Sequence, residues 1–355
     1  MKKIVFYMTV VSLVLYYAGI VMAEESSVGE KGNGTSIQTV QSILSSIKLG
    51  GGISSGYFYT SNPGEDGDDD AFLLSNLLVE LSSVDNPGPV GFSTAFGESS
   101  TPSILGTPEN NTDFKIEYAS VNIAPISGMA LEMGLLQPNA GYESTYTYNN
   151  KNITLGAVAS QQPYNAYGAR ISYDAGGITM WGGYYKDRLD DEEYNSPDYA
   201  WEAGVKTSIA GNDISLYDYH IHGQRNLLGM VVERTIDNLD LALNIDYWTW
   251  DDRIKSLYKD KSSMGGALYI CPNIGRLSLP VRLEYIKQDG SRIYIDCGNT
   301  KKIYSATFSP TWHFNENAYV RAESAYISAD HGFVNSDGIV KDGRTNIAIE
   351  AGFIF

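Results

Sequence analysis

Cysteine, basic residues and long apolar runs are all scarce in this chain of 355 residues. Two cysteines, Cys271 and Cys297, are too few for a disulfide-stabilised scaffold. The 25 lysines and arginines are outnumbered by 42 acidic residues, and a net charge of −17 disfavours binding to nucleic acid. Aromatic residues make up 12% of the chain, which is too many for a disordered protein. What remains is a folded protein with an acidic surface.

The N-terminal residues predict export. Lys2 and Lys3 precede an apolar run from Ile4 to Ile20, and small residues follow in the segment 21–23. We interpret residues 1–23 as a secretory signal peptide. An uncleaved membrane anchor is the alternative, because the run is close to the shortest length of a spanning helix. No later apolar run reaches about 18 residues, so no further membrane helix is predicted.

The next segment, 24–47, is predicted to be a polar lead that ends in a short helix. Apolar residues recur at helical spacing within 36–47, which favours an amphipathic helix too short to fold alone. From Lys48 onward the period becomes two and persists to Phe355. Residues 48–355 are therefore predicted to form one β domain.

The strands of this domain alternate an apolar face with a polar one. In the last strand, Ile347, Ile349 and Phe353 alternate with Asn346 and Glu350, and the segments 239–247 and 277–285 follow the same pattern. One face is suited to hydrocarbon, whereas the other tolerates charge.

The connections predict a transmembrane β-barrel, because short turns alternate with long polar stretches. The short turns are 85–88, 126–128, 175–177, 211–213 and 237–239; the long stretches are 61–70, 98–113, 186–198, 251–261, 289–300 and 330–344. About seventeen strands can be counted, yet a barrel with both ends on one side needs an even number. We assign the weakest candidate, 153–160, to a long third loop over 138–166.

Sixteen strands then remain, and this all-β antiparallel barrel is the predicted fold class. Their ranges are 48–59, 71–83, 90–98, 113–124, 129–137, 167–174, 178–186, 199–209, 214–222, 226–235, 239–250, 262–271, 277–287, 301–309, 317–328 and 345–355.

Three stretches give the chain a family resemblance. They are the aromatic end 352–355 (GFIF), the segment 133–143 (MGLLQPNAGYE) and the segment 162–170 (QPYNAYGAR). With these, the chain resembles Gram-negative outer-membrane porins, in particular the putative β-barrel porin group. The resemblance implies that the terminal aromatic serves as an assembly signal and that the third loop folds into the lumen and narrows it. The chain departs from general porins because this loop holds only Glu143 and Lys151 as charges.

The polar face of a sixteen-strand barrel should surround an aqueous channel. Charges predicted on this face include Lys115, Glu117, Arg170, Glu202, Lys206, Asp218, Asp246, Arg282, Glu284, Arg321, Glu323 and Glu350. The candidate constriction consists of Glu143 and Lys151 on the loop, facing Arg170, Arg282 and Arg321 on the wall, because opposed charges in a narrow pore set ion preference. Lys115, Glu117 and Glu323 complete the predicted pore lining. Alternatively, each of these is a hydrated charge far from any constriction.

Aromatic residues near strand ends are predicted to lie at the membrane interface, with cross-strand packing as the alternative. They are Trp181, Tyr184, Tyr185, Tyr199, Trp201, Tyr247, Trp248, Trp250, Tyr285 and Tyr326.

Other chemistry has little support in the sequence. Asp218, His220 and His222 share a strand face but lack a further ligand, and the acidic stretch 65–70 favours a solvated loop over a calcium site. No motif selects Ser215, His220 and Asn244 as a catalytic set. Cys271 and Cys297 are predicted to lie too far apart for a disulfide. We therefore expect no metal, no cofactor and no enzymatic activity.

The leading hypothesis is a porin for passive diffusion of small hydrophilic solutes or ions across the bacterial outer membrane. The alternatives are a non-transporting barrel whose external loops serve binding or adhesion, an outer-membrane enzyme, and a secreted soluble β protein. Expected partners are outer-membrane lipids, the outer-membrane assembly machinery and small hydrophilic solutes. A homotrimer and a monomer both remain open.

Overall fold

The computed structural model describes residues 47–63, 69–83, 90–106, 114–186, 199–251, 262–288, 300–334 and 339–355. The chain divides into two units, and the one made of Leu49–Ser82 and Gly88–Phe355 carries the fold. Of the other unit, Met1–Lys48 with Ser83–Pro87, only Ile47, Lys48 and Ser83 are described. The predicted signal peptide and the predicted helix up to residue 46 lie outside the described residues. No helix among the described residues is long and apolar enough to cross a membrane.

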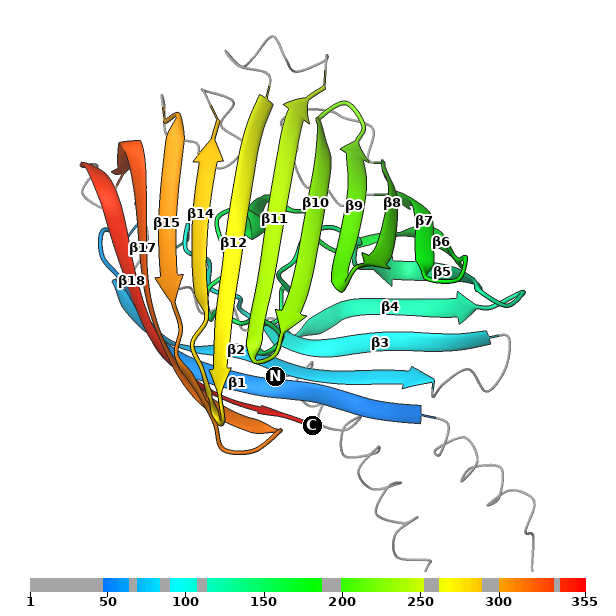
Figure 1. Cartoon of the computed structure of the whole chain (residues 1–355), viewed down its shortest axis with the longest axis horizontal. Coiled ribbons are helices and arrows are strands. Elements are labelled where there is room, and N and C mark those ends of the chain that lie inside the picture. Colours follow the sequence, from blue (N-terminus) through cyan, green and yellow to red (C-terminus); the bar gives the residue numbers. More distant parts are fainter. Residues whose placement is uncertain are drawn as a thin grey trace, which may run out of the picture. The chain divides into compact units, whose positions relative to one another are not determined.

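The described chain is almost entirely antiparallel β-sheet (Figure 1). The strands are β1 (Ile47–Thr60), β2 (Asp70–Ser83), β3 (Val90–Ser99), β4 (Lys115–Ile123), β5 (Met129–Leu136), β6 (Ala166–Asp174), β7 (Ile178–Lys186), β8 (Ala200–Ile209), β9 (Asn212–Ile221), β10 (Arg225–Ile236), β11 (Leu239–Trp250), β12 (Ser262–Ile274), β13 (Leu277–Ser278), β14 (Val281–Lys287), β15 (Lys302–Phe308), β16 (Thr311–His313), β17 (Ala318–Val334) and β18 (Val340–Ile354).

Two prolines explain why eighteen segments form sixteen strands. Pro280 separates β13 from β14 and Pro310 separates β15 from β16, because proline has no N–H to donate to the ladder. The two interruptions lie side by side, since β13 pairs with β16, β14 pairs with β15, and the Ser309 N–H donates to the Pro280 carbonyl at 3.0 Å. Each pair of segments is one interrupted strand. The described residues therefore form sixteen strands, which confirms the number predicted from the sequence.

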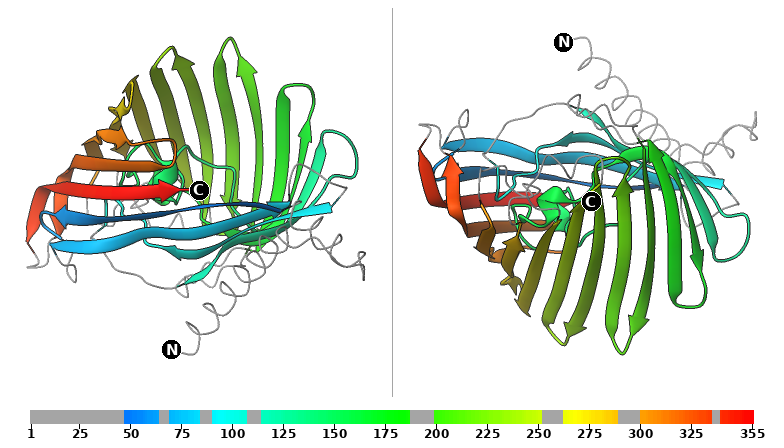
Figure 2. Two further views of the ribbon diagram at one scale, coloured as in Figure 1. Left: turned by 90° about the horizontal axis from the view of Figure 1, so that it is seen from below. Right: turned by 90° about the horizontal axis from the view of Figure 1, so that it is seen from above.

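The first and last strands close the sheet into a barrel. Strand β1 pairs with β2 and with β18, and the backbones of Gly51 and Phe355 exchange two hydrogen bonds of 3.0 and 3.1 Å. Seen from below and from above, strands β10–β12 lie on the other side of the molecule from β1 and β2 (Figure 2). Closure leaves the paired backbone without an open sheet edge, as a membrane requires.

Two predictions about the connections have different outcomes. Residues 153–160 are not a spanning strand, because Leu155 forms only an isolated bridge with Ser103 and the 3₁₀-helix η2 (Ala159–Gln161) begins within the range. The prediction of a loop over 330–344 was wrong at both ends. Strands β17 and β18 continue into it, with Phe333 opposite Lys341 beyond an irregularity in register. Polar composition misled the prediction, because strands that extend beyond a membrane can carry polar side chains.

Burial in the barrel is inverted relative to a soluble protein. Ile347 and Ile349 on β18 are 46% and 57% exposed, whereas Glu350, the residue after Ile349, is fully buried. On β14, Leu283 and Tyr285 are exposed while Arg282 is fully buried. An apolar outer face and a polar inner face are what a lipid-embedded barrel needs.

Large aromatic rings on the inner face pack over glycines of the neighbouring strand. Trp181 lies directly opposite Gly204, and Tyr217 lies opposite Gly229. A Cβ atom built on either glycine would come within 2.1 Å of the ring, so only glycine leaves room for it.

This packing corrects part of the aromatic prediction. Trp181, Tyr185 and Trp248 are buried, so they do not face lipid, whereas Tyr184, Trp201, Tyr247, Tyr285 and Tyr326 are exposed. Parity along each strand separates the two groups, because alternate residues point to opposite faces.

Replacing Gly229 by alanine should destabilise the barrel by about 1–3 kcal/mol, because the added methyl group overlaps the Tyr217 ring. The measurement is the urea midpoint of unfolding in detergent. Gly266→Ala is the matched control, since its Cβ would meet only a carbonyl oxygen 3.9 Å away. Equal midpoints for the two variants would contradict the packing argument.

Candidate functional site

Residues Gln137–Asn165, called segment 137–165 below, join β5 to β6 and contain little regular structure. They include the 3₁₀-helices η1 (Thr147–Asn149) and η2. Gly141 has φ of +87°, a conformation that favours glycine, and Pro138 and Pro163 further disfavour a regular strand. Apolar residues fix the middle of the segment: Ile153 is fully buried and belongs to a cluster with Phe58 and Leu73 of the wall.

Carboxylates of the wall accept hydrogen bonds from the backbone of this segment. Glu323 on β17 accepts the N–H groups of Ile153 at 2.6 Å and Thr154 at 3.1 Å. Glu284 on β14 accepts the N–H of Val158 at 2.9 Å. These bonds satisfy buried backbone donors that would otherwise lose their hydration without compensation.

Arginines on the barrel strands, which form the wall, donate hydrogen bonds to backbone carbonyl oxygens of the same segment. Arg321 donates to Thr147 at 2.8 Å and to Asn150 at 2.9 Å, and Arg282 donates to Thr154 at 2.6 Å. Arg170 does the same at the start of the segment, where it donates to Gln137 at 2.8 Å.

Each of these arginines also has a carboxylate partner. Arg321 pairs with Glu350 at 2.6 Å, Arg282 with Glu143 at 2.6 Å, and Arg170 with Glu132 at 2.6 Å and Glu202 at 3.4 Å. Arg282 is fully buried and Arg321 nearly so. The wall arginines are therefore neutralised and engaged with segment 137–165.

The structure brings only part of the predicted constriction set together. Glu143 does face Arg282, but Lys151 pairs with Asp240 of the wall at 2.8 Å. Lys115 lies 3.6 Å from Glu117, while Glu323 holds the segment backbone. That these residues line or constrict a pore stays a prediction.

Burial shifts the pKa of two groups on the segment, Glu143 and Tyr148. Burial raises the pKa of Glu143, while the Arg282 guanidinium and the Gly156 N–H oppose this shift. The Gly156 N–H donates to Glu143 at 2.6 Å. Burial also raises the pKa of the Tyr148 phenol, which donates to Glu80 at 2.8 Å and stays neutral at neutral pH.

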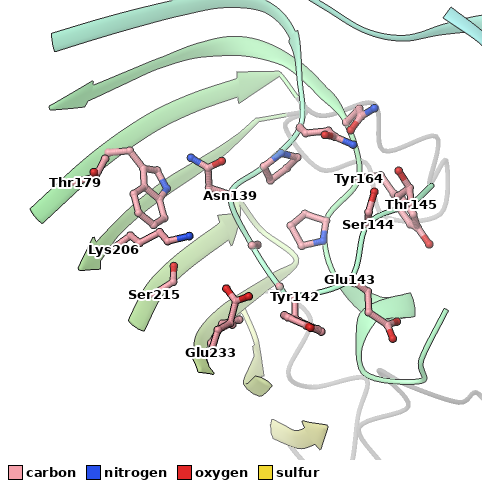
Figure 3. Close-up of a pocket in the computed structure, with 18 residues that line it drawn as sticks. Asn139, Tyr142, Glu143, Ser144, Thr145, Tyr164, Thr179, Lys206, Ser215 and Glu233 are labelled. Carbon is pink, nitrogen blue, oxygen red and sulfur yellow. The ribbon is translucent and has the colours of Figure 1, made fainter. Parts of the chain in front are cut away.

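Two of the cavities beside the segment are both lined by Thr145, Tyr164 and Asn165. Cavity A measures about 450 Å³ and lies between Asn139–Thr145 and strands β7–β10; cavity B measures about 380 Å³ and is lined by Lys115 and Glu117. In cavity A, Lys206, Ser215 and Glu233 face Asn139 and Tyr142 across the space (Figure 3).

Glu233 was missed as a candidate, and Lys206 was counted only among the general inward charges. Both lie on inward-facing positions of β10 and β8, so strand parity was the available signal. Sequence alone did not say which inward charges segment 137–165 would cover.

Some residues were weighed in the sequence for metal binding or catalysis, although neither kind of site was predicted. Among the described residues, no group of three or more His, Cys, Asp or Glu side chains could hold a metal ion. Asp218 lies on the outward phase of β9, like the exposed Leu216, which corrects its assignment to the pore. It accepts a hydrogen bond from Asn226 at 2.8 Å.

Ser215 lines cavity A, while His220, an odd number of residues away, points to the other face. Cys271 is a free, buried cysteine, and Cys297 and residues 65–68 lie outside the described residues.

Proteins of known structure share this architecture. Solved structures similar to it include the outer membrane channel DcaP of Acinetobacter baumannii, with a TM-score of 0.60 at 12% identity over 87% of this chain and 97% of that chain. The anion-selective porin from Comamonas acidovorans gives 0.59 at 13% identity over 87% and 99%. OmpT of Vibrio cholerae in its trimer form gives 0.57 at 11% identity over 87% and 99%.

These identities show a common fold alone, and no protein of curated function matches the chain. The family model described as "Putative beta-barrel porin-2, OmpL-like" matches residues 46–355. This match covers most of the chain and agrees with the closed sixteen-strand barrel and its apolar outer face. The chain therefore belongs to this family of β-barrel porins of the bacterial outer membrane.

Proposed function

We propose that this porin carries small hydrophilic solutes or ions passively across the bacterial outer membrane, through a passage that segment 137–165 restricts from inside the barrel. The observation that carries the proposal is the set of contacts between the segment and inward-facing wall residues on strands β8, β14 and β17. The proposal involves no catalytic step. It needs only a wetted path and an apolar outer face.

The position of the segment is supported from two directions. Its partners Glu202, Glu284 and Glu323 alternate along their strands with exposed residues, so they belong to the inner face. Seen from below and from above, the short green coil of the segment falls between strands β10–β12 and strands β1 and β2 (Figure 2). A segment fixed at this place would leave cavities A and B as the two larger free spaces beside it.

The path we propose runs through both cavities past Thr145, Tyr164 and Asn165, which line each of them. Tyr164 is 58% exposed, so its ring projects into this space rather than into the packed part of the segment. Lys115 and Glu117 on the cavity B side would then be pore-lining charges, as the sequence predicted. Glu143, Arg170, Arg282, Arg321 and Glu323 would act mainly by holding the segment in place.

The outer face determines the partners that we propose. Exposed apolar side chains, such as Ile349 on β18 and Leu283 on β14, would contact outer-membrane lipids. Phe355 directly follows the closing strand β18, and its ring would contact the outer-membrane assembly machinery. A homotrimer is proposed by analogy with the trimer form of Vibrio cholerae OmpT, to which the fold is similar.

The test of the channel function is single-channel recording from the purified protein in planar bilayers. Ohmic steps should appear, and the reversal potential in a salt gradient should give the ion preference. A correctly folded barrel that inserts but stays electrically silent would rule out the diffusion channel and return attention to binding by the external loops.

Truncating Tyr164 to alanine should raise the single-channel conductance, because its side chain lines both cavities on the proposed path. Tyr167→Ala is the matched control, since that tyrosine is 51% exposed on the outward phase of β6. An unchanged conductance for Tyr164→Ala would show that the path does not pass this residue.

Changing Glu143 to glutamine should loosen segment 137–165, because Arg282 would lose the partner of its buried charge. The local cost should be about 3 kcal/mol, at the low end for a buried pair, since Glu284 lies 3.4 Å from Arg282. Faster hydrogen exchange at the amides of residues 153–158 is the expected result.

Lys151→Gln is the control for this change. It removes a partly exposed pair with Asp240, which should contribute only about 0–1 kcal/mol. If both variants exchange at the wild-type rate, the buried ion pair does not hold the segment.

A further inference from the structure

Cavity A contains two opposite charges that have no ion-pair partner among the described residues. Lys206 on β8 is exposed to the cavity, and Glu233 on β10 is half-buried. Neither takes part in any of the ion pairs found in the described part of the chain, whereas Arg170, Arg282 and Arg321 are each neutralised by a carboxylate. The free charges of this cavity are therefore Lys206 and Glu233.

Strand register fixes how far apart the two charges lie. Lys206 pairs with Ser215, Ser215 pairs with Val231, and Glu233 follows two residues later on β10. Two strand spacings across and two residues along give roughly 12 Å between the Cα atoms. With both side chains directed into the cavity (Figure 3), the space between their charged ends suits a solute with two charged groups.

Each end of this pair has a second feature that favours a ligand. Near Lys206, Trp181 lines the cavity and is only 8% exposed, and its indole N–H has no hydrogen-bond acceptor in the part of the chain that the structure describes. Trp181 is held in place because its ring lies over Gly204, two residues from Lys206 on β8. A solute carboxylate could accept hydrogen bonds from both the lysine and the indole.

At the other end, Asp213 lies directly opposite Glu233 in the register of β9 and β10. Like charges in this arrangement repel, and Asp213 is otherwise bonded to the hydroxyl of Ser208. An ammonium group at Glu233 would reduce this repulsion. The neighbouring groups that titrate are Tyr142, which is neutral because burial raises its pKa, and Glu143, which is paired with Arg282.

We propose that cavity A is a binding subsite for small zwitterions of the size of a free amino acid or a dipeptide. The solute carboxylate contacts Lys206 and the Trp181 indole N–H, and the solute ammonium contacts Glu233. A volume of about 450 Å³ is sufficient for such a solute. The inference rests on the proposed function, because the subsite lies on the path proposed for diffusion.

The test compares three solutes that share one carbon skeleton: L-alanine carries both charges, lactate only the carboxylate, and L-alaninamide only the ammonium. Each is titrated against single-channel conductance at constant salt, and binding is measured in parallel by saturation-transfer NMR on the detergent-solubilised barrel. L-Alanine should reduce the conductance and show saturation transfer at concentrations about tenfold lower than either singly charged solute. Equal effects of the three solutes, or none, would overturn the subsite.

Variants separate this role from a structural one. Lys206→Gln and Glu233→Gln should each abolish the preference for L-alanine, and the charge-swapped double variant Lys206→Glu/Glu233→Lys should restore it. Lys302→Gln, an exposed lysine on the outward phase of β15, is the control. A double variant that behaves like the single variants would contradict the two-charge mechanism.

The two proposals fail in different ways. A barrel that conducts ions but does not distinguish the three solutes refutes the zwitterion subsite and leaves the channel intact. A barrel that stays silent in bilayers refutes the channel, while the NMR comparison still decides whether cavity A binds L-alanine.

Discussion

Hydrogen bonds between the long, irregular segment 137–165 and charged residues of the barrel wall decide which inward-facing charges are buried. Segment 137–165 has few internal hydrogen bonds, so most of its buried N–H and C=O groups need partners from elsewhere. The wall supplies acceptors through Glu202, Glu284 and Glu323 and donors through Arg170, Arg282 and Arg321. The inner face therefore replaces water around a backbone that forms neither helix nor sheet.

This arrangement changes what the charged residues can do for transport. A guanidinium that is buried, paired with a carboxylate and bonded to backbone carbonyls contributes little net charge to a neighbouring aqueous space. Arg282 is the clearest case, because it is fully buried between Glu143 and Thr154. The uncovered charges of cavity A, Lys206 and Glu233, would instead be the ones that act on a solute in the free space.

Glycines on the inner face make room for large aromatic side chains. Trp181 and Tyr217 each occupy space above a glycine of the adjacent strand, so rings fit inside a curved wall without pushing strands apart. The same principle fixes the indole that we assign to the solute carboxylate. Packing of the wall and the shape of cavity A are thus coupled through one cross-strand pair, Trp181 and Gly204.

The sequence by itself determined the barrel. Alternation of period two, the sorting of short and long connections, and the need for an even strand number led to sixteen strands, and they correctly removed residues 153–160 from the sheet. These features are local or follow from chain order, so no tertiary information was required. Even the two proline interruptions leave the strand count unchanged, because they lie beside each other in adjacent strands.

Only the tertiary structure decided which inward charges meet segment 137–165 and which remain free. Strand parity places Lys206 and Arg282 on the same inner face, yet one is exposed and the other fully buried. The difference arises from contacts between residues more than a hundred positions apart, such as Glu143 with Arg282. Periodicity carries no information about such contacts, because it records the face on which a side chain lies and not what covers that face.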